Sequence, residues 1–177
     1  MKQYSYLITA LTGLLVAGLT SSACAKSLAT ECAEAKAEFL SKDESLKKTL
    51  SKASGYAIFP KVAKGAFGIG AAAGKGEVYE TGNDKAVGEA KLKQVTVGFQ
   101  AGGQAYAELI LFEDKTSLDN FKKGNFEFSA QATAVAIKAG AAANAKFENG
   151  MMVFTIAKGG LMYEASVGGQ KFSYTAY

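Results

Sequence analysis

The sequence predicts an α+β fold, in which a helical arm over residues 28–53 is followed by a curved, mostly antiparallel, glycine-rich β-sheet over residues 55–177. Two observations predict it. Leu28, Cys32 and Phe39 recur at helical spacing, so one face of the arm is apolar. Beyond the arm, short segments of alternating polarity are separated by glycines, which is typical of strands and turns.

The arm is expected to contain two helices. The stretch Ser41-Lys42-Asp43-Glu44 has the spacing of a capping box, which predicts that the second helix begins there. Gly55 stands where a helix of this length would end. Cys32 is expected to be a small apolar packing residue, with intermolecular pairing as the alternative.

The sheet is expected to consist of short strands joined by glycine-containing turns. Val95, Val97 and Phe99, for example, alternate with polar neighbours. Gly82-Asn83-Asp84 indicates a turn within a surface loop over Glu80–Glu89. The predicted strands are Tyr56–Phe59, Phe67–Ala73, Glu77–Glu80, Gln94–Ala101, Ala105–Phe112, Phe126–Ala136, Met151–Ile156, Leu161–Val167 and Lys171–Thr175.

One short helix is expected to interrupt the strands, over residues 115–123. Asp114 is placed to cap it, and Leu118 and Phe121 share one helical face. Gly124 follows as a natural stop.

The amino-terminal residues 1–25 have the features of a secretory signal peptide. A lysine at position 2 precedes an apolar run, and Ala23-Cys24-Ala25 matches the small-x-small pattern of a cleavage site. Removal of 25 of the 177 residues leaves a mature chain of 152 residues, the size of a single domain, over residues 26–177. A lipidated Cys24 is the alternative. Either way we expect an exported protein, periplasmic or membrane-associated.

Residue usage argues against several functions. The chain has no histidine, and Cys32 is the one cysteine after the signal, so His-dependent catalysis and an ordinary zinc site are excluded. The pair Glu113-Asp114 precedes a predicted helix and is better explained by capping. The chain also lacks arginine, which argues against sequence-specific reading of nucleic acid. We expect no enzyme, no metal, no cofactor and no nucleic-acid partner.

The stretch Phe59–Gly76, FPKVAKGAFGIGAAAGKG, superficially resembles a nucleotide-binding loop. In a phosphate-binding loop four residues separate the glycines, but Gly70 and Gly74 enclose three, and Lys75 is followed by Gly76 rather than by Ser or Thr. A dinucleotide site would require a helix after the glycines, where this chain continues as a strand. Nucleotide binding is therefore rejected.

The same stretch cannot be a membrane-spanning helix, because Pro60, Lys61 and Lys64 interrupt the apolar run. We interpret it as a Gly-Ala hairpin with a positive bias, since no acidic residue occurs between Glu44 and Glu77. The lysines inside or beside this acid-free region are Lys47, Lys48, Lys52, Lys61, Lys64 and Lys75.

Aromatic residues are interleaved with these lysines, namely Tyr56, Phe59 and Phe67. Such a region can lie on an anionic membrane, with lysines on the phosphates and an aromatic side chain among the headgroups. The alternative is a solvated surface above a core that the same aromatics form.

Several motifs, taken in order, resemble the SYLF lipid-binding domain. They extend from about Lys52 to Tyr174 and include KASGYAIF at 52–59, KGAFG at 64–68, VGFQAGGQ at 97–104, LILF at 109–112, VF at 153–154, KGGL at 158–161 and EAS at 164–166. The resemblance implies binding of phospholipids, phosphoinositides in particular. Some eukaryotic members also bind actin, which we do not expect of an exported bacterial protein.

One departure from the family concerns the amino terminus. Eukaryotic members carry a basic, lipid-binding amphipathic helix there, whereas this chain has the signal and a glutamate-bearing segment over residues 28–40. Family lipid contacts are therefore not transferred to individual residues. The predicted function is non-enzymatic binding of anionic phospholipid membranes by an exported protein. The alternative is an exported structural or partner-binding protein without lipid affinity.

Overall fold

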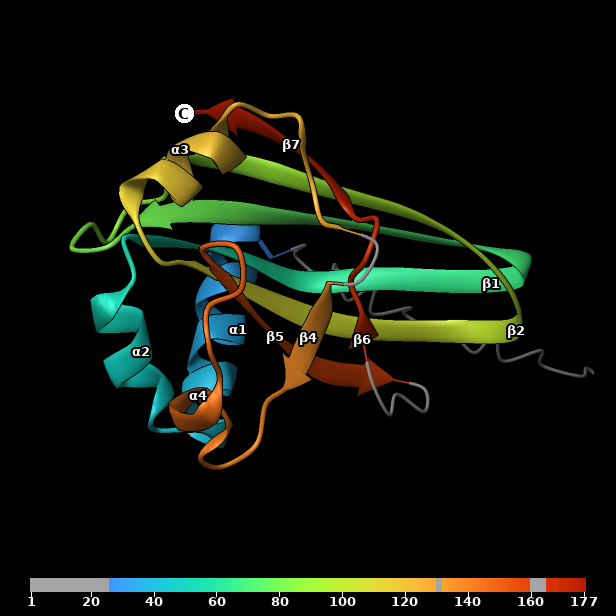
Figure 1. The fold of residues 1–177 in the computed structure, drawn as a ribbon, viewed down its shortest axis with the longest axis horizontal. Helices are drawn as coiled ribbons and strands as arrows, with labels where there is room; N and C mark the ends of the chain where they lie inside the picture. Colours follow the sequence, from blue (N-terminus) through green and yellow to red (C-terminus); the bar gives the residue numbers. More distant parts are fainter. Residues whose placement is uncertain (1–25, 130–131, 160–164) are drawn as a thin grey trace, which may run out of the picture.

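The computed structural model describes residues 26–129, 132–159 and 165–177, and within them it leaves the side chains of 66–69, 96–102, 159 and 165–166 undescribed. Two helices, α1 (Leu28–Lys42) and α2 (Leu46–Lys52), come first, as expected for the helical arm (Figure 1). The elements that follow are β1 (Gly55–Glu80), β2 (Gly88–Phe112), α3 (Lys115–Lys122), β3 (Phe126–Glu127), β4 (Thr133–Ala136), α4 (Ala141–Asn144), β5 (Met151–Gly159), β6 (Ala165–Ser166) and β7 (Lys171–Ala176).

The sheet is curled and mostly antiparallel, with β2 at its centre. The strand order is β3-β7-β2-β5-β4-β6, and β1 also pairs with β2. The first part of β2 pairs with β7 and the second part with β5. Only β4 and β5 run parallel among the strand pairs of the described residues. The α+β class and the mostly antiparallel sheet agree with the prediction.

The predicted division of the first strands is wrong. Residues predicted as Tyr56–Phe59, Phe67–Ala73 and Glu77–Glu80 form one strand, β1, and the predicted strands Gln94–Ala101 and Ala105–Phe112 both lie in β2. The glycine stretch is therefore not a hairpin turn. The turn of this long hairpin lies at residues 81–87, where Gly82 has a φ of +85° and Asn83 N–H donates to Glu80 O at 3.0 Å. The turn predicted there is confirmed.

Glycines in β1 allow the two halves of the strand to lie against each other. The hairpin folds back at its far end, and the β1–β2 register shifts between Phe67 and Ile69 (Figure 1). A Cβ on Gly76 would fall on Ile58 O and 2.7 Å from Phe59 Cδ1. A Cβ on Gly74 would lie 2.9 Å from Val62 Cγ2. Close approach of two backbones thus explains these glycines.

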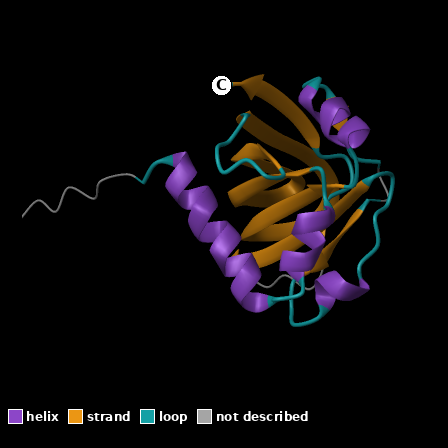
Figure 2. Cartoon of the chain, turned by 90° about the vertical axis from the view of Figure 1, so that its left-hand side faces the viewer, coloured by secondary structure: helices purple, strands orange, loops and turns teal. Residues whose placement is uncertain are grey.

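Two apolar cores form on opposite faces of the curled sheet. On one face, α1 and α2 bury Cys32, Phe39 and Leu46 against residues that include Ile58 and Phe154 (Figure 2). The Cys32 thiol lies 3.6 Å from Ile58 O, so its predicted packing role is confirmed. On the other face, aromatic rings gather around Phe172, namely Phe59, Phe121, Phe126 and Phe128.

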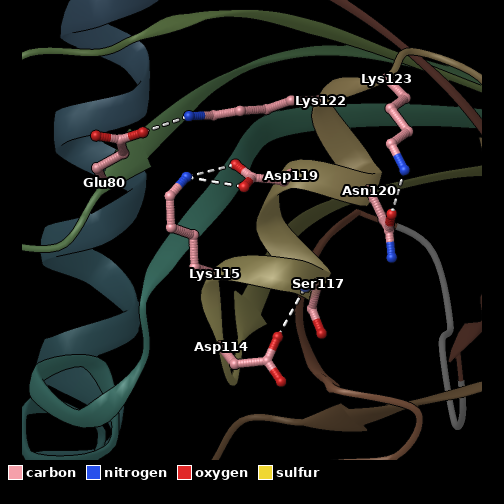
Figure 3. Close-up of polar contacts among 8 residues, drawn as sticks. All are labelled: Glu80, Asp114, Lys115, Ser117, Asp119, Asn120, Lys122 and Lys123. Carbon is pink, nitrogen blue, oxygen red and sulfur yellow. Dashed lines mark hydrogen bonds and ion pairs between the residues drawn. The ribbon is translucent and has the colours of Figure 1, made fainter.

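Helix α3 has the predicted position and cap. The Asp114 carboxylate accepts a hydrogen bond from Ser117 N–H at 2.7 Å, and the helix stops before Gly124, whose φ is +79°. Lys122 forms an ion pair with Glu80 at the end of β1, which anchors the helix to the sheet (Figure 3).

The second helix begins at Leu46, not within the predicted capping box. Ser41 lies inside α1, where its hydroxyl donates to Glu38 O at 2.8 Å. The chain turns instead at Asp43, whose carboxylate accepts hydrogen bonds from Ser45.

The predictions for the later part of the chain are less accurate. Of the predicted strand Phe126–Ala136, residues 130–131 lie outside the described chain, and the described part forms the short strands β3 and β4. The helix α4 was not expected. Of the predicted strand Leu161–Val167, residues 161–164 lie outside the described chain, and Ala165–Ser166 forms β6.

Candidate functional site

Exposed lysines gather at the end of the molecule formed by α2 and α4. Lys47, Lys48 and Lys52 are exposed on α2, as predicted for the basic part of the arm. Lys138 and Lys146 are exposed on either side of α4 in the sequence. We call the three α2 lysines and the surface that α2 shares with α4 the α2–α4 face. Lys146 lines a separate cavity, of about 500 Å³, together with Glu127 and Glu148. Helices α2 and α4 lie in the lower part of Figure 1.

The buried carboxylate of Asp43 holds the α2–α4 face together. Its Oδ2 accepts a hydrogen bond from Ala142 N–H at 2.7 Å, and its Oδ1 accepts one from the Ser45 hydroxyl, also at 2.7 Å. Burial alone would raise the pKa of Asp43, but these hydrogen bonds outweigh it and hold the pKa below its ordinary value. The carboxylate therefore stays ionised and links α2 to α4. A second link runs from the Thr49 hydroxyl to Ala142 O at 3.4 Å.

The sequence contains no Asp or Glu over residues 45–76 or 128–147, and the fold brings parts of these two segments together. The acidic residues next to these segments are Asp43 and Glu44 before α2 and Glu148 after Lys146. The ion pairs of the described residues involve none of the α2 lysines and neither Lys138 nor Lys146. Their charge is therefore available to an anionic partner.

A shallow cavity opens between α2 and α4. Its volume is about 280 Å³, and Lys48 and Lys52 line it together with the hydroxyl side chains of Ser45 and Thr49. Further lining residues on the sheet side are apolar and include Phe147 and Met152. Ammonium and hydroxyl donors beside an apolar wall can bind a phosphate group that carries a hydrophobic substituent.

The remaining predicted lysines, all on β1, do not join the α2–α4 face. Lys61 lines a different cavity, of about 510 Å³, opposite the α1 carboxylates Glu31, Glu34 and Glu38. Two of these carboxylates form ion pairs with other lysines, Glu34 with Lys26 and Glu38 with Lys158.

Farther along β1, Lys64 is half-buried and Lys75 is exposed. Lys75 lies opposite Lys91 of β2, on another part of the surface. The six predicted lysines therefore do not form one continuous patch.

The predicted aromatic contacts with lipid need correction. Tyr56 is 7% exposed and Phe59 is fully buried, because both side chains pack in the cores of the sheet. Neither can enter a bilayer without unfolding the strand, so we do not propose them as lipid contacts. The side chain of Phe67 and the predicted lipidation site Cys24 lie outside the described residues.

Sequence reasoning missed Lys138 and Lys146. A signal for them was present, since residues 128–147 lack acidic residues just as residues 45–76 do. The two segments are brought together by the hydrogen bond between Asp43 and Ala142, which are 99 positions apart in the sequence. No local sequence pattern indicates such a contact.

Within the ranges that the structure describes, no group of three or more Cys, Asp or Glu side chains is arranged to hold a metal ion. Nor does any helix of those ranges combine the length and the apolar character needed to cross a bilayer.

These features define a class of protein: an α+β domain that presents a lysine-rich surface for binding. A family described as "Las17-binding protein actin regulator" (Ysc84) matches residues 93–176. This match confirms the resemblance to the SYLF domain over those residues. The SYLF/Ysc84 family is linked to lipid binding and actin regulation, and it is a family of binding domains rather than of enzymes.

A curated relative is similar over part of the chain. Beta cell expansion factor A of Aeromonas veronii is 35% identical over 83 residues, which is 46% of this chain and 32% of that protein. The chain thus matches about a third of the length of this relative.

Proposed function

We propose that this protein binds membranes containing anionic phospholipid, through the α2–α4 face. The single observation that carries the proposal is the set of three exposed lysines on α2 without ion-pair partners among the described residues, two of which, Lys48 and Lys52, line a cavity with an apolar wall. The link of the SYLF/Ysc84 family to lipid binding supports the same function.

The expected strength of the interaction requires more than charge. Each lysine near an anionic bilayer contributes about 1 kcal/mol. The α2 lysines Lys47, Lys48 and Lys52 would together contribute roughly 3 kcal/mol, which corresponds to binding weaker than about 1 mM. The apolar wall at Phe147 and Met152 can add contact with the glycerol region of one lipid.

The proposal is tested by reversing the charge of α2. We expect the variant Lys47→Glu, Lys48→Glu, Lys52→Glu to bind phosphatidylcholine vesicles containing phosphatidylglycerol at least about 100-fold more weakly than the natural protein. Sedimentation with vesicles measures the binding, and vesicles of phosphatidylcholine alone give the background. Because these side chains are exposed, circular dichroism should stay native.

A matched variant controls for the change in net charge. Lys26→Glu, Lys85→Glu, Lys123→Glu alters the same number of exposed lysines on other elements and should retain most of the binding. Equal binding by both triple variants and the natural protein would remove the α2–α4 face from the mechanism. Absence of binding by the natural protein would favour the alternative, a structural or partner-binding protein without lipid affinity.

The headgroup is tested in the same assay. We propose no preference beyond negative charge, although the family resemblance implies phosphoinositides. Vesicles with phosphatidylinositol and with phosphatidylglycerol, at equal surface charge, distinguish charge-dependent binding from recognition of the inositol headgroup.

We also propose that the protein is exported, with residues 1–25 as a cleaved signal and Lys26 as the first mature residue. Helix α1 begins at Leu28, two residues after the proposed first mature residue. Ser27 caps α1 by accepting from Thr30 N–H at 3.2 Å, and Lys26 forms an ion pair with Glu34 at 2.6 Å. The alternative remains an acylated Cys24.

A further inference from the structure

A second group of lysines lies on the outer face of the sheet, far from α2 and α4. It consists of Lys75 on β1, Lys91 and Lys93 on β2, and Lys171 on β7, and all four are exposed. We call them the sheet lysines. The inward neighbours Leu92 and Phe172 are buried, so the alternation of these strands directs all four lysines outward.

The strand register places the sheet lysines in like-charged pairs. Lys75 lies directly opposite Lys91, and Lys93 lies directly opposite Lys171. Directly opposed residues of antiparallel strands have Cβ atoms about 5 Å apart, where like charges destabilise the sheet.

Carboxylates offset only part of this charge. Glu89 approaches Lys91 at 3.5 Å and Glu127 approaches Lys171 at 3.4 Å. In the part of the chain that the structure describes, Lys75 and Lys93 take part in no ion pair.

The side chains around the sheet lysines are short. Ala71, Ala73 and Ser173 are exposed neighbours on the same face, and Val95 is 71% exposed. Because the neighbouring side chains are short, the long and flexible lysines extend beyond them. They can therefore contact an extended anionic surface at the same time. A planar bilayer with dispersed phosphates meets that arrangement better than a compact ligand, which would need a cavity.

The elements that carry the two lysine groups are well separated, since α2 and α4 lie in the lower part of Figure 1 and β7 lies at the top. This separation leaves the sheet lysines available for a contact other than the one made by the α2–α4 face. We propose that the sheet lysines bind a second anionic membrane, so that one molecule bridges two membranes. This inference rests on the proposed function of the α2–α4 face.

Vesicle clustering tests whether one molecule bridges two membranes. Two populations of phosphatidylcholine–phosphatidylglycerol vesicles, one with a donor lipid dye and one with an acceptor, are mixed with protein, and energy transfer and light scattering report docking. We expect the natural protein to cluster vesicles, with a maximum at an intermediate ratio of protein to lipid. At saturation, separate molecules occupy every vesicle surface and bridging declines.

The variant Lys91→Glu, Lys93→Glu separates bridging from binding. We expect it to sediment with vesicles as the natural protein does, while the rate of clustering falls at least about tenfold. The control Lys85→Glu, Lys123→Glu has the same change in net charge and should cluster normally. Undiminished clustering by Lys91→Glu, Lys93→Glu would overturn the inference, as would binding by the natural protein without clustering. Absence of vesicle binding by the natural protein would instead refute the proposed function.

Discussion

Glu108 is the most deeply buried acidic residue of the described chain, and it lies on β2 opposite Thr155 of β5. Gln170 Nε2 donates to Glu108 Oε2 at 3.0 Å and to the Tyr106 hydroxyl at 3.1 Å. Burial raises the pKa of Glu108 to about 8 from an ordinary value of 4.5, and the hydrogen bond from Gln170 only partly opposes this rise. At neutral pH the side chain is thus mainly a neutral acid in the folded protein.

This burial predicts a pH-dependent stability. The unfolded chain loses the Glu108 proton near pH 4.5, but the folded chain holds it up to about pH 8. The folded state therefore binds more protons between these values, and the free energy of unfolding should fall as pH rises through that window. We expect Glu108→Gln to flatten this dependence and to be more stable than the natural protein above neutral pH. Urea unfolding at several pH values measures it, and parallel pH curves for the two proteins would contradict the assignment.

At the level of whole elements, the fold depends on the close contact between the two halves of β1. A methyl group at Gly76 would collide with Ile58 O and Phe59, neither of which can move without disturbing the strand pairing. We expect Gly76→Ala to destabilise the protein by about 1–3 kcal/mol and to lower Tm by roughly 5–10 °C. Thermal unfolding followed by circular dichroism measures the change.

Gly103 provides the matched control for that substitution. A Cβ at Gly103 would meet nothing within 4 Å, although this residue also lies in the long hairpin. Gly103→Ala should therefore leave Tm nearly unchanged. Equal Tm values for the two variants would show that backbone contact is not the reason for glycine at position 76.

Elements were predictable where local chemistry determines them. The apolar residues at helical spacing predicted α1, and the cap Asp114 together with such residues predicted α3. The continuity of β1 was missed because glycine in a sequence resembles a turn, whereas Gly76 serves a contact between residues that are 18 positions apart. Helix α4 has only four residues, too few to show apolar residues at helical spacing, so no sequence pattern indicates it.

At the scale of the molecule, the sequence predicted half of the candidate site. The α2 lysines were identified from an acid-free segment, and their exposure follows from the helix. Alternating polarity along a strand does not show which of its two faces is buried. Near Tyr56 and Phe59 both faces of β1 are buried, each in a different core. Tyr56 and Phe59 were therefore assigned to the surface wrongly, and for these two the alternative, a core formed by the aromatics, is confirmed. The contribution of the α4 region depended on a contact distant in sequence.

The arrangement of charge over the whole molecule also predicts how the protein leaves a membrane. If attachment relies on exposed lysines, raising the salt concentration to about 1 M shortens the screening length from about 10 Å to about 3 Å and weakens every such contact. We expect a high-salt wash to release the protein from isolated membranes without detergent, and the released chain to have the intact mass of unmodified residues 26–177. An acylated Cys24 would instead hold the protein through buried CH₂ groups, which salt does not screen. Release only by detergent, together with a mass increased by acyl chains, would establish that lipid anchor and make the lysines secondary to it.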